Sequence, residues 1–173
     1  MKNISLHEPS IEEYYYEEKI QSDPKTMSYN AGYDVSYYGY HYDTGCIDFP
    51  KDRWQLKYDY RKNNDVFFRY IKDNNTNNYI GYVYYQFNKE EKRYECGILI
   101  EYDYRGKGYS KDALRLLCNE ASNNGIKELY DNFEIERGNT LNLFLSVGFK
   151  VVEETTWKKF NKDVNGVIVK IEL

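Results

Sequence analysis

The stretch YRGKGYSKDALRLL, residues 104–117, contains the residues of this chain that are best suited to chemistry. Two glycines and two cations stand together, after an apolar run and before apolar residues at helical spacing. A helix start presents unpaired backbone N–H groups and the positive end of the helix dipole, which bind phosphate oxygens. Glycines let phosphates approach the backbone, and Arg105 and Lys107 add charge. The stretch predicts a pyrophosphate site; alternatively, Gly106 and Gly108 only form a turn.

The loop contains neither the GKS or GKT ending of a P-loop nor the GxGxxG of dinucleotide-binding folds. Instead, residues 105–110 (RGKGYS) resemble the acyl-CoA signature R/Q-x-x-G-x-G/A of the GNAT family of N-acetyltransferases, with Ser110 at its last position. The segment ECGILIEYDYRGKGYSKDALRLL resembles the family's fourth strand, phosphate loop and third helix, and LNLFLSVGF resembles its final helix. The resemblance covers residues 66–173, roughly the C-terminal two-thirds.

The resemblance implies transfer of an acetyl group from acetyl-CoA to a primary amine, by direct attack in a ternary complex. Acetyl-CoA would be the acetyl-donor co-substrate, with its pyrophosphate on backbone N–H groups of the loop. Its pantetheine arm would lie along the preceding strand, where a backbone N–H could polarise the thioester carbonyl. The positions implied to bind acetyl-CoA are Ile98, Leu99, Ile100, Arg105, Gly106, Lys107, Gly108, Tyr109, Ser110, Asn139 and Phe144.

This reaction needs a base for the ammonium, a donor for the developing oxyanion and an acid for the departing thiolate. Glu95 lies ten residues before Arg105, where many family members carry a strand glutamate. The resemblance therefore implies that Glu95 is the catalytic base. The alternative is a solvent-facing strand residue paired with a nearby cation.

The position of the acid departs from the family pattern. Members often carry a tyrosine four residues before the glycine of Gly148-Phe149; here that residue is Phe144, which has no proton to give. Arg137 occupies the usual position of a helix asparagine, and Asn139 lies two residues later. Because thiolate is a good leaving group, we expect an active enzyme in which solvent or another group protonates it. The alternative is a non-catalytic acyl-CoA-binding or regulatory module.

Substrate choice is expected to lie in residues 24–65, a Tyr-rich region on the substrate side that looks lineage-specific. Aromatic faces and a carboxylate can hold an ammonium, so the acceptor is expected to be a small-molecule amine or a protein amino group. The candidate substrate-binding residues are Tyr29, Tyr33, Tyr38, His41 and Asp43. The alternative is that A/T-rich codons of a low-GC bacterial genome account for the tyrosines.

Composition limits the other classes of function. The 173 residues carry a formal net charge of −4, which argues against a nucleic-acid partner. Cys46, Cys96 and Cys118 are isolated, and with only His7 and His41 beside them no metal site is expected. No apolar run approaches membrane-spanning length and no signal-peptide core is evident, so a cytoplasmic protein without a membrane partner is expected. The oligomeric state, monomer or homodimer, stays open.

The elements that position these residues can be read from periodicity. They predict one α+β domain over residues 1–173 with a mainly antiparallel sheet. The resemblance implies the GNAT-type fold, a mixed, mostly antiparallel sheet flanked by helices. The polar segment NKDVNG is expected to be the turn of a final hairpin. Helices are expected at 11–22, near 53–61, at 110–123 and at 139–147, and strands at 3–8, 65–73, 79–88, 93–101, 127–133, 150–160 and 165–173.

Overall fold

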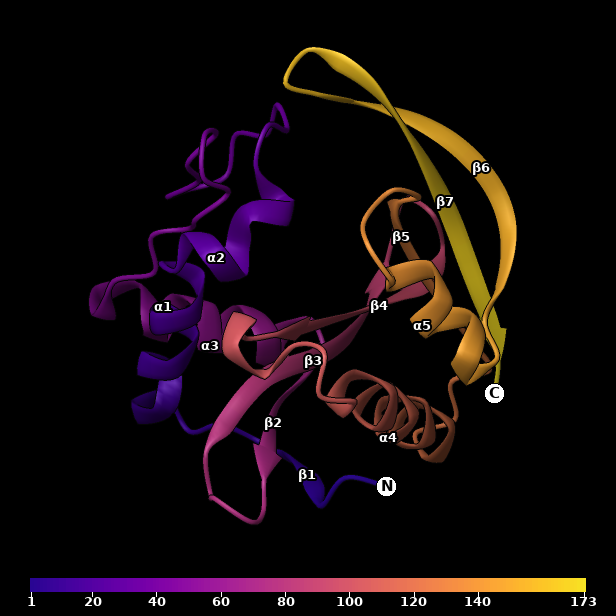
Figure 1. Ribbon diagram of the computed structural model, residues 1–173. Coiled ribbons are helices and arrows are strands. Elements are labelled where there is room, and N and C mark those ends of the chain that lie inside the picture. Colours follow the sequence, from indigo (N-terminus) through magenta and orange to yellow (C-terminus); the bar gives the residue numbers. More distant parts are fainter.

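The computed structural model describes residues 1–173, which fold around one seven-stranded sheet (Figure 1). Its strand order is β1-β2-β3-β4-β5-β7-β6, and every neighbouring pair is antiparallel except β4–β5, which is parallel. The strands are β1 (Ile4–His7), β2 (Phe67–Asp73), β3 (Tyr79–Asn88), β4 (Arg93–Ile100), β5 (Glu128–Glu134), β6 (Lys150–Lys159) and β7 (Lys162–Glu172). The expected α+β class with a mixed, mostly antiparallel sheet is confirmed.

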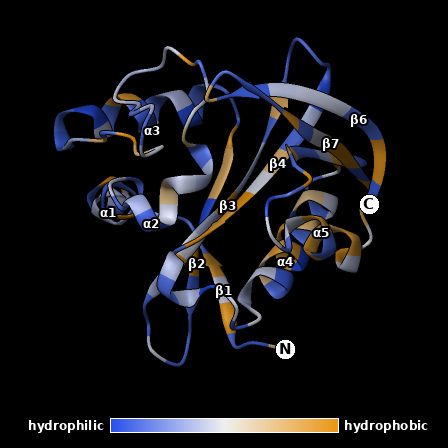
Figure 2. Ribbon diagram, turned by 45° about the horizontal axis from the view of Figure 1, so that its top comes forward, coloured by the Kyte–Doolittle hydropathy of each residue, from blue (hydrophilic) through white to orange (hydrophobic).

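Helices cover both faces of the sheet. They are α1 (Tyr15–Gln21), α2 (Pro24–Met27), α3 (Trp54–Asn63), α4 (Tyr109–Asn123) and α5 (Thr140–Val147). The main core lies between the sheet and the pair α4–α5, and a second cluster packs α1 and α2 on the other face (Figure 2). No helix has both the length and the apolar character needed to span a bilayer.

Helix α4 forms as its pattern predicts. It begins after Gly108, whose φ of +84° is a left-handed conformation that favours glycine, and its C-cap is Asn124. The apolar residues of its inner face are all buried against the sheet, which fixes the helix in place. These residues are Ala113, Leu114, Leu117, Cys118 and Ala121.

Strands β4 and β5 separate along their length, and this separation positions the site. They share a single bridge, Glu95 with Tyr130, whereas β3 and β4 pair along the whole of β4. Beyond the bridge, residues 96–100 of β4 and 131–134 of β5 run apart. An edge of backbone N–H and C=O groups is thereby left open inside the sheet, where an extended ligand could pair with it.

The final hairpin differs from the expectation. Its turn is Phe160-Asn161, both with positive φ (+49° and +59°), so β7 begins at Lys162 rather than after the polar segment NKDVNG. Phe160 is an unfavourable residue for this conformation, and so the turn had no sequence signal. Tertiary contact stabilises it instead: the Phe160 N–H donates to the Gly32 carbonyl at 2.7 Å.

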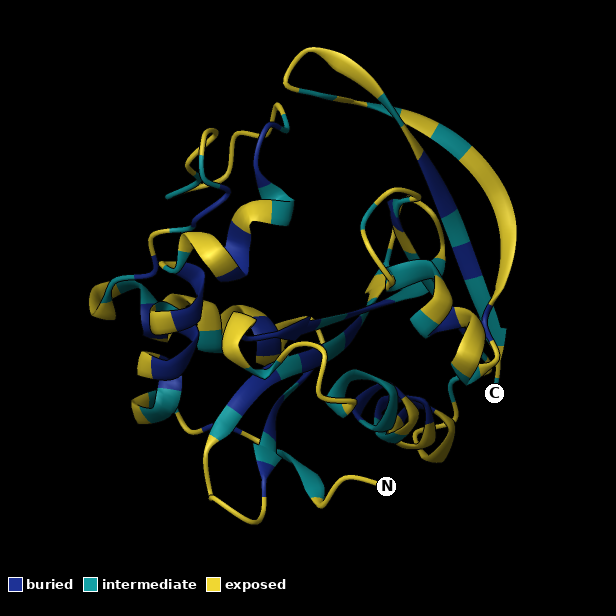
Figure 3. Ribbon diagram, viewed as in Figure 1, coloured by how far each residue is buried: buried dark blue, intermediate teal, exposed yellow.

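Strand β6 is an edge strand and is mostly exposed (Figure 3). Hairpin β6–β7 extends beyond the rest of the sheet and arches towards the segment after α2 (Figure 1). A Cβ on Gly32 would lie 2.5 Å from the Phe160 ring, so only glycine lets the two segments meet this closely. The hairpin therefore bridges the Tyr-rich region and the C-terminal half of the sheet.

Candidate active site

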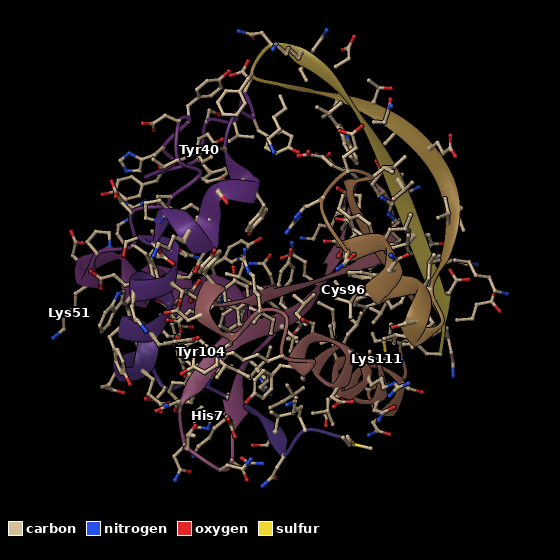
Figure 4. All side chains as sticks on the ribbon, viewed as in Figure 1. His7, Tyr40, Lys51, Cys96, Tyr104 and Lys111 are labelled. Atoms are coloured by element: carbon tan, nitrogen blue, oxygen red, sulfur yellow. The ribbon has the colours of Figure 1, made fainter.

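A cleft of about 920 Å³ lies where β4 and β5 separate. Strands β3, β4 and β5 form its base, the loop before α4 and the start of α5 form its sides, and residues 28–29 reach it from the opposite face. Cys96, next to the bridge, and Lys111, in the first turn of α4, both line it (Figure 4). The cleft thus extends from the point where β4 and β5 separate to the glycine loop.

The open edge of β4 supplies backbone donors to this cleft. The Glu101 N–H donates to the Ile80 carbonyl of the neighbouring chain segment at 3.0 Å. Since alternate residues of an antiparallel strand face its partner, the N–H groups of Ile98 and Ile100 point away from β3, towards the cleft. Ile98, Leu99 and Ile100, expected from the sequence, all line the cleft.

The glycine loop presents further donors. The N–H groups of Gly106, Lys107 and Gly108 donate to no backbone carbonyl of the chain. Gly106 has a φ of +71°, and a Cβ added to it would have no atom within 4 Å, so a bound group can lie directly on the backbone. With the start of α4 beyond them, these N–H groups form an anion-binding concavity.

The charged and aromatic side chains of the loop serve mainly to hold its shape. Arg105 donates from Nε to the Ile100 carbonyl at 2.9 Å and from Nη2 to the Thr26 carbonyl at 2.7 Å. Burial lowers the pKa of this guanidinium, which ties the loop to β4 and α2. Arg105, Gly106, Gly108 and Ser110 line the cleft.

Two expected binding residues of the loop lie outside the cleft lining. The Lys107 ammonium lies over the Tyr104 ring, 5.4 Å from its centroid. The Tyr109 hydroxyl donates to Asp73 at 2.9 Å. Only the backbone of these two residues is left to contribute to anion binding.

Glu95 lines the cleft, but its carboxylate is fully engaged. Oε1 accepts from Arg93 Nε at 3.1 Å and Nη2 at 3.0 Å, and Oε2 accepts from Asn88 Nδ2 at 3.1 Å. Arg93 in turn lies over the Tyr130 ring, 4.9 Å from its centroid. Glu95 thus lines the cleft, and it is also paired with a cation, as the alternative interpretation of the sequence predicts.

Asp131 is a second carboxylate in the cleft and is not among the residues expected from the sequence. It follows the bridging residue Tyr130, and its one hydrogen bond is from the Asn132 N–H to Oδ1 at 2.8 Å. Burial raises the pKa of Asp131 to about 7. The sequence does contain a signal for this residue. Asp131 lies between the core residues Leu129 and Phe133 on the same face of β5, and a carboxylate on an apolar strand face is unusual.

Tyr29 also lines the cleft, and its ring centroid lies 3.9 Å from the Arg137 guanidinium carbon. Tyr82 and Tyr84 of β3, which the sequence did not single out, line it as well. The Tyr84 ring covers Gly97, where a Cβ would lie 2.5 Å from the ring. Together these residues give the cleft an aromatic wall.

The remaining candidates of the Tyr-rich region do not line the cleft. Tyr33 donates to the Glu134 carboxylate, Tyr38 stacks on Arg53 at 3.8 Å, and His41 pairs with Asp48 at 2.9 Å. Asp43 is exposed. The physical reason is that this segment folds on itself through the Tyr40–Ile47 bridge, which leaves Tyr38, His41 and Asp43 away from the site.

The start of α5 completes the cleft. Asn139 and Phe144 line it, and Phe144 is buried between Phe133 and Phe149, with ring centroids 5.0 Å and 4.9 Å away. Phe144 is therefore a packing residue at the wall. The structure brings no group of three or more His, Cys, Asp or Glu side chains together in a way that could hold a metal ion.

A mixed sheet whose parallel pair opens onto a glycine-rich helix start defines a class of protein that can bind an extended, phosphate-bearing cofactor. The sequence comparison is more specific. The model of the Acetyltransferase (GNAT) family matches residues 12–149, a range that includes residues 24–65. The chain belongs to this family and is an N-acetyltransferase. No curated protein matches it.

Solved structures share the fold at low identity. Spermidine N-acetyltransferase from Vibrio cholerae, in complex with CoA and spermine, has a TM-score of 0.78 at 15% identity, over 98% of this chain and 95% of its own. Phosphinothricin acetyltransferase from Sinorhizobium meliloti, in complex with AcCoA, has 0.76 at 15%, over 99% and 89%. An N-acetyltransferase from Staphylococcus aureus Mu50 has 0.74 at 16%, over 99% of both chains.

Proposed function

We propose that this N-acetyltransferase takes its acetyl group from acetyl-CoA and transfers it to a primary amine by direct attack in a ternary complex. The observation that carries the proposal is the continuity of the cleft: the open edge of β4 leads without interruption to the glycine loop at the start of α4. A ligand suited to it has an extended polar arm and a pyrophosphate. Two fold neighbours, from Vibrio cholerae and Sinorhizobium meliloti, are complexes with CoA or AcCoA.

On the donor side, the pyrophosphate would accept hydrogen bonds from the N–H groups of residues 106–110. The pantetheine arm would pair with the outward-facing backbone of Ile98 and Ile100, as an added strand does. The Ile98 N–H would then polarise the thioester carbonyl and stabilise the oxyanion that forms on attack. Asn139 and Phe144 would flank the arm from α5.

On the acceptor side, we propose that the aromatic wall of Tyr29, Tyr82 and Tyr84 binds the acceptor. Aromatic faces attract cations, and Glu95 and Asp131 add carboxylates at the same end of the cleft. An ammonium suits this environment, whether it belongs to a small molecule or to a protein amino group. Direct attack requires the amine and acetyl-CoA to be bound in the cleft at the same time.

A thiol-release assay with acetyl-CoA and a panel of amines tests the function. The panel should contain polyamines, amino acids, monoamines and peptides with a free α-amino or lysine amino group. We expect amine-dependent release of CoA thiol with at least one class, and a product heavier by one acetyl group in mass spectrometry. Binding of CoA with no thiol release across the panel would contradict the proposal and favour an acyl-CoA-binding module.

A further inference from the structure

The acceptor ammonium must lose a proton before its nitrogen can attack, and two carboxylates line the end of the cleft where this would happen. Building on the proposed function, we propose that Asp131, rather than Glu95, is the general base that takes this proton. Asp131 differs from Glu95 in position, in free hydrogen-bonding capacity and in electrostatic surroundings.

Position is the first argument. Glu95 and Tyr130 form the only bridge between β4 and β5, so Asp131 and Cys96 are the first residues past the point where the strands separate. A thioester whose carbonyl accepts from the Ile98 N–H lies two residues short of this point, a distance of roughly 7 Å at about 3.3 Å per residue. Asp131 therefore lies just beyond the acyl end of the arm, with room between them for the acceptor nitrogen.

The second argument is the capacity to accept a proton. Both oxygens of Glu95 accept hydrogen bonds, one from the Arg93 guanidinium and one from the Asn88 amide. A proton on Glu95 would require that ion pair to break. Asp131 has no cationic partner, and only its Oδ1 accepts a hydrogen bond, from the Asn132 N–H. Its Oδ2 is free to meet an ammonium.

The third argument is the set of charged and titratable groups around Asp131. Burial raises the pKa of Asp131 to about 7; the Asn132 N–H and Arg137, in the segment before α5, act to lower this pKa, and Glu95 on β4 acts to raise it. The ionised Asp131 in turn raises the pKa of Tyr84 on β3, of Cys96 on β4 and of Tyr29 after α2, although burial is the first cause at each.

A carboxylate with these surroundings can cycle between its two protonation states near neutral pH. Asp131 takes one proton from R–NH3+, which leaves the neutral amine. The nitrogen lone pair attacks the thioester carbonyl carbon, the C–N bond forms and the carbonyl oxygen becomes an oxyanion. When the oxyanion collapses, the C–S bond breaks, and the second nitrogen proton goes to the thiolate, which gives CoA thiol. Asp131 returns its proton to solvent.

The test compares Asp131→Asn with three other proteins, using acetyl-CoA and the amine with the highest turnover in the panel. We expect Asp131→Asn to lower kcat by about 10²- to 10³-fold, with a small change in the KM for acetyl-CoA. For the wild type, kcat/KM should fall as the pH drops below about 7, which gives the profile an acid limb. The residual activity of Asp131→Asn should lack this acid limb. Glu95→Gln should lower kcat by less than about tenfold and keep that limb. Glu128→Gln, which also neutralises a carboxylate of β5 but outside the cleft, should match the wild type.

Thermal unfolding shows whether Asp131→Asn folds, and gives a readout that needs no substrate. Asp131 has a folded-state pKa raised above that of the unfolded chain, so its stabilising contribution is present below about pH 4 and is lost as the pH rises through 7. The Asn variant should therefore match the wild-type Tm at pH 4 and exceed it by at least about 3 °C at pH 8.

The outcomes separate the two proposals. A wild-type protein that acetylates an amine, together with an Asp131→Asn variant that keeps its kcat and its acid limb, overturns the role of Asp131 and leaves the proposed function intact. A folded wild type that releases no thiol with any amine overturns the proposed function, and the role of Asp131 with it. If Glu95→Gln alone removes the acid limb, Glu95 is the base.

Discussion

Two carboxylates at the same end of the cleft have opposite surroundings, and their chemistry follows from this difference. Glu95 holds the Arg93 guanidinium, and Arg93 lies over the ring of Tyr130 on the next strand. Glu95 therefore helps to join β4 and β5 at their single bridge. Asp131, one position past that bridge, has no such partner. The first carboxylate can fix the geometry of the strands while the second is left to exchange protons.

At Gly106 a single added methyl group should separate donor binding from folding. Gly106 has a φ of +71° and its Cβ position is empty, so Gly106→Ala meets no protein atom but does meet a ligand that lies on the backbone. The strained φ costs about 1 kcal/mol of stability. We expect the Kd for CoA, measured by calorimetry, to rise at least tenfold.

Gly125→Ala is a matched control for this variant. Gly125 has a φ of +80° and an equally empty Cβ position, but it lies after the C-terminal end of α4, outside the cleft. It should lose similar stability and keep the wild-type Kd. Equal Kd values for the two variants would show that the ligand does not approach the backbone at Gly106.

The sequence predicts the lining of the cleft better around the glycine loop than in the Tyr-rich region. The glycine loop acts through backbone groups that are local in the chain, so its motif suffices to predict an anion site. The residues around Asp131 indicate only that a carboxylate lies on an apolar strand face. Its position beside β4 and its lack of a cationic partner depend on how the strands pair, and the local sequence does not contain that information.

At the scale of elements, Glu13 joins three segments of the N-terminal part. Its carboxylate accepts from the Ser10 N–H at 2.8 Å, contacts the His7 ring nitrogen at 2.8 Å and accepts from the Tyr79 hydroxyl of β3. Burial raises the pKa of Glu13, but these hydrogen bonds outweigh it and lower the pKa to about 2. The contribution of Glu13 to stability is therefore present above about pH 4.5 and is lost as the pH falls through 2.

Replacing Glu13 by Gln should therefore destabilise the protein in a pH-dependent way. We expect Glu13→Gln to lower the free energy of unfolding by about 2 kcal/mol at pH 7, a fall in Tm of roughly 4–8 °C. In calorimetric melts the difference should shrink between pH 4.5 and 2. The exposed neighbour Glu12 provides the control, since Glu12→Gln should change Tm little at either pH. A constant difference across this pH range would contradict the ionic origin.

Elements with a strong period were predicted well, and those set by tertiary contact were not. Strand β3 has the bounds expected from its apolar and aromatic run, and α4 begins within one residue of its expected start. The expected position of the last hairpin's turn is wrong because Phe160 has no preference for positive φ. Gly32, about 130 residues earlier in the chain, supplies the contact that stabilises it.

At the scale of the whole molecule, the tip of hairpin β6–β7 holds the Tyr-rich region beside the cleft. Lys159 donates from Nζ to the Tyr29 carbonyl at 3.2 Å and to Glu134 Oε1 at 2.8 Å. The Phe160 ring packs edge-on against Tyr42, with centroids 5.4 Å apart. Since Tyr29 lines the cleft, the tip of this hairpin helps to position the aromatic wall.

Phe160→Ala should therefore alter acceptor binding more than donor binding. We expect the KM for the amine to rise about 3- to 10-fold, through loss of roughly 1 kcal/mol of packing, with the KM for acetyl-CoA unchanged within twofold. Phe87→Ala is the control, because Phe87 is equally exposed, at 46%, and packs on Tyr94 away from the hairpin. An equal change in both KM values would argue against a specific link to the acceptor.

The single bridge between β4 and β5 has a consequence for the stability of the protein. The sheet is two half-sheets, β1–β4 and β5–β7, that share very few backbone hydrogen bonds at their seam. A bound acetyl donor that pairs with the open edge of β4 would link the two half-sheets for as long as it is bound. At a hundred times its Kd such a ligand adds about 2.7 kcal/mol to the free energy of unfolding. Bound acetyl-CoA would then stabilise the sheet whose cleft it occupies. Release of CoA after each turnover would briefly remove that stabilisation.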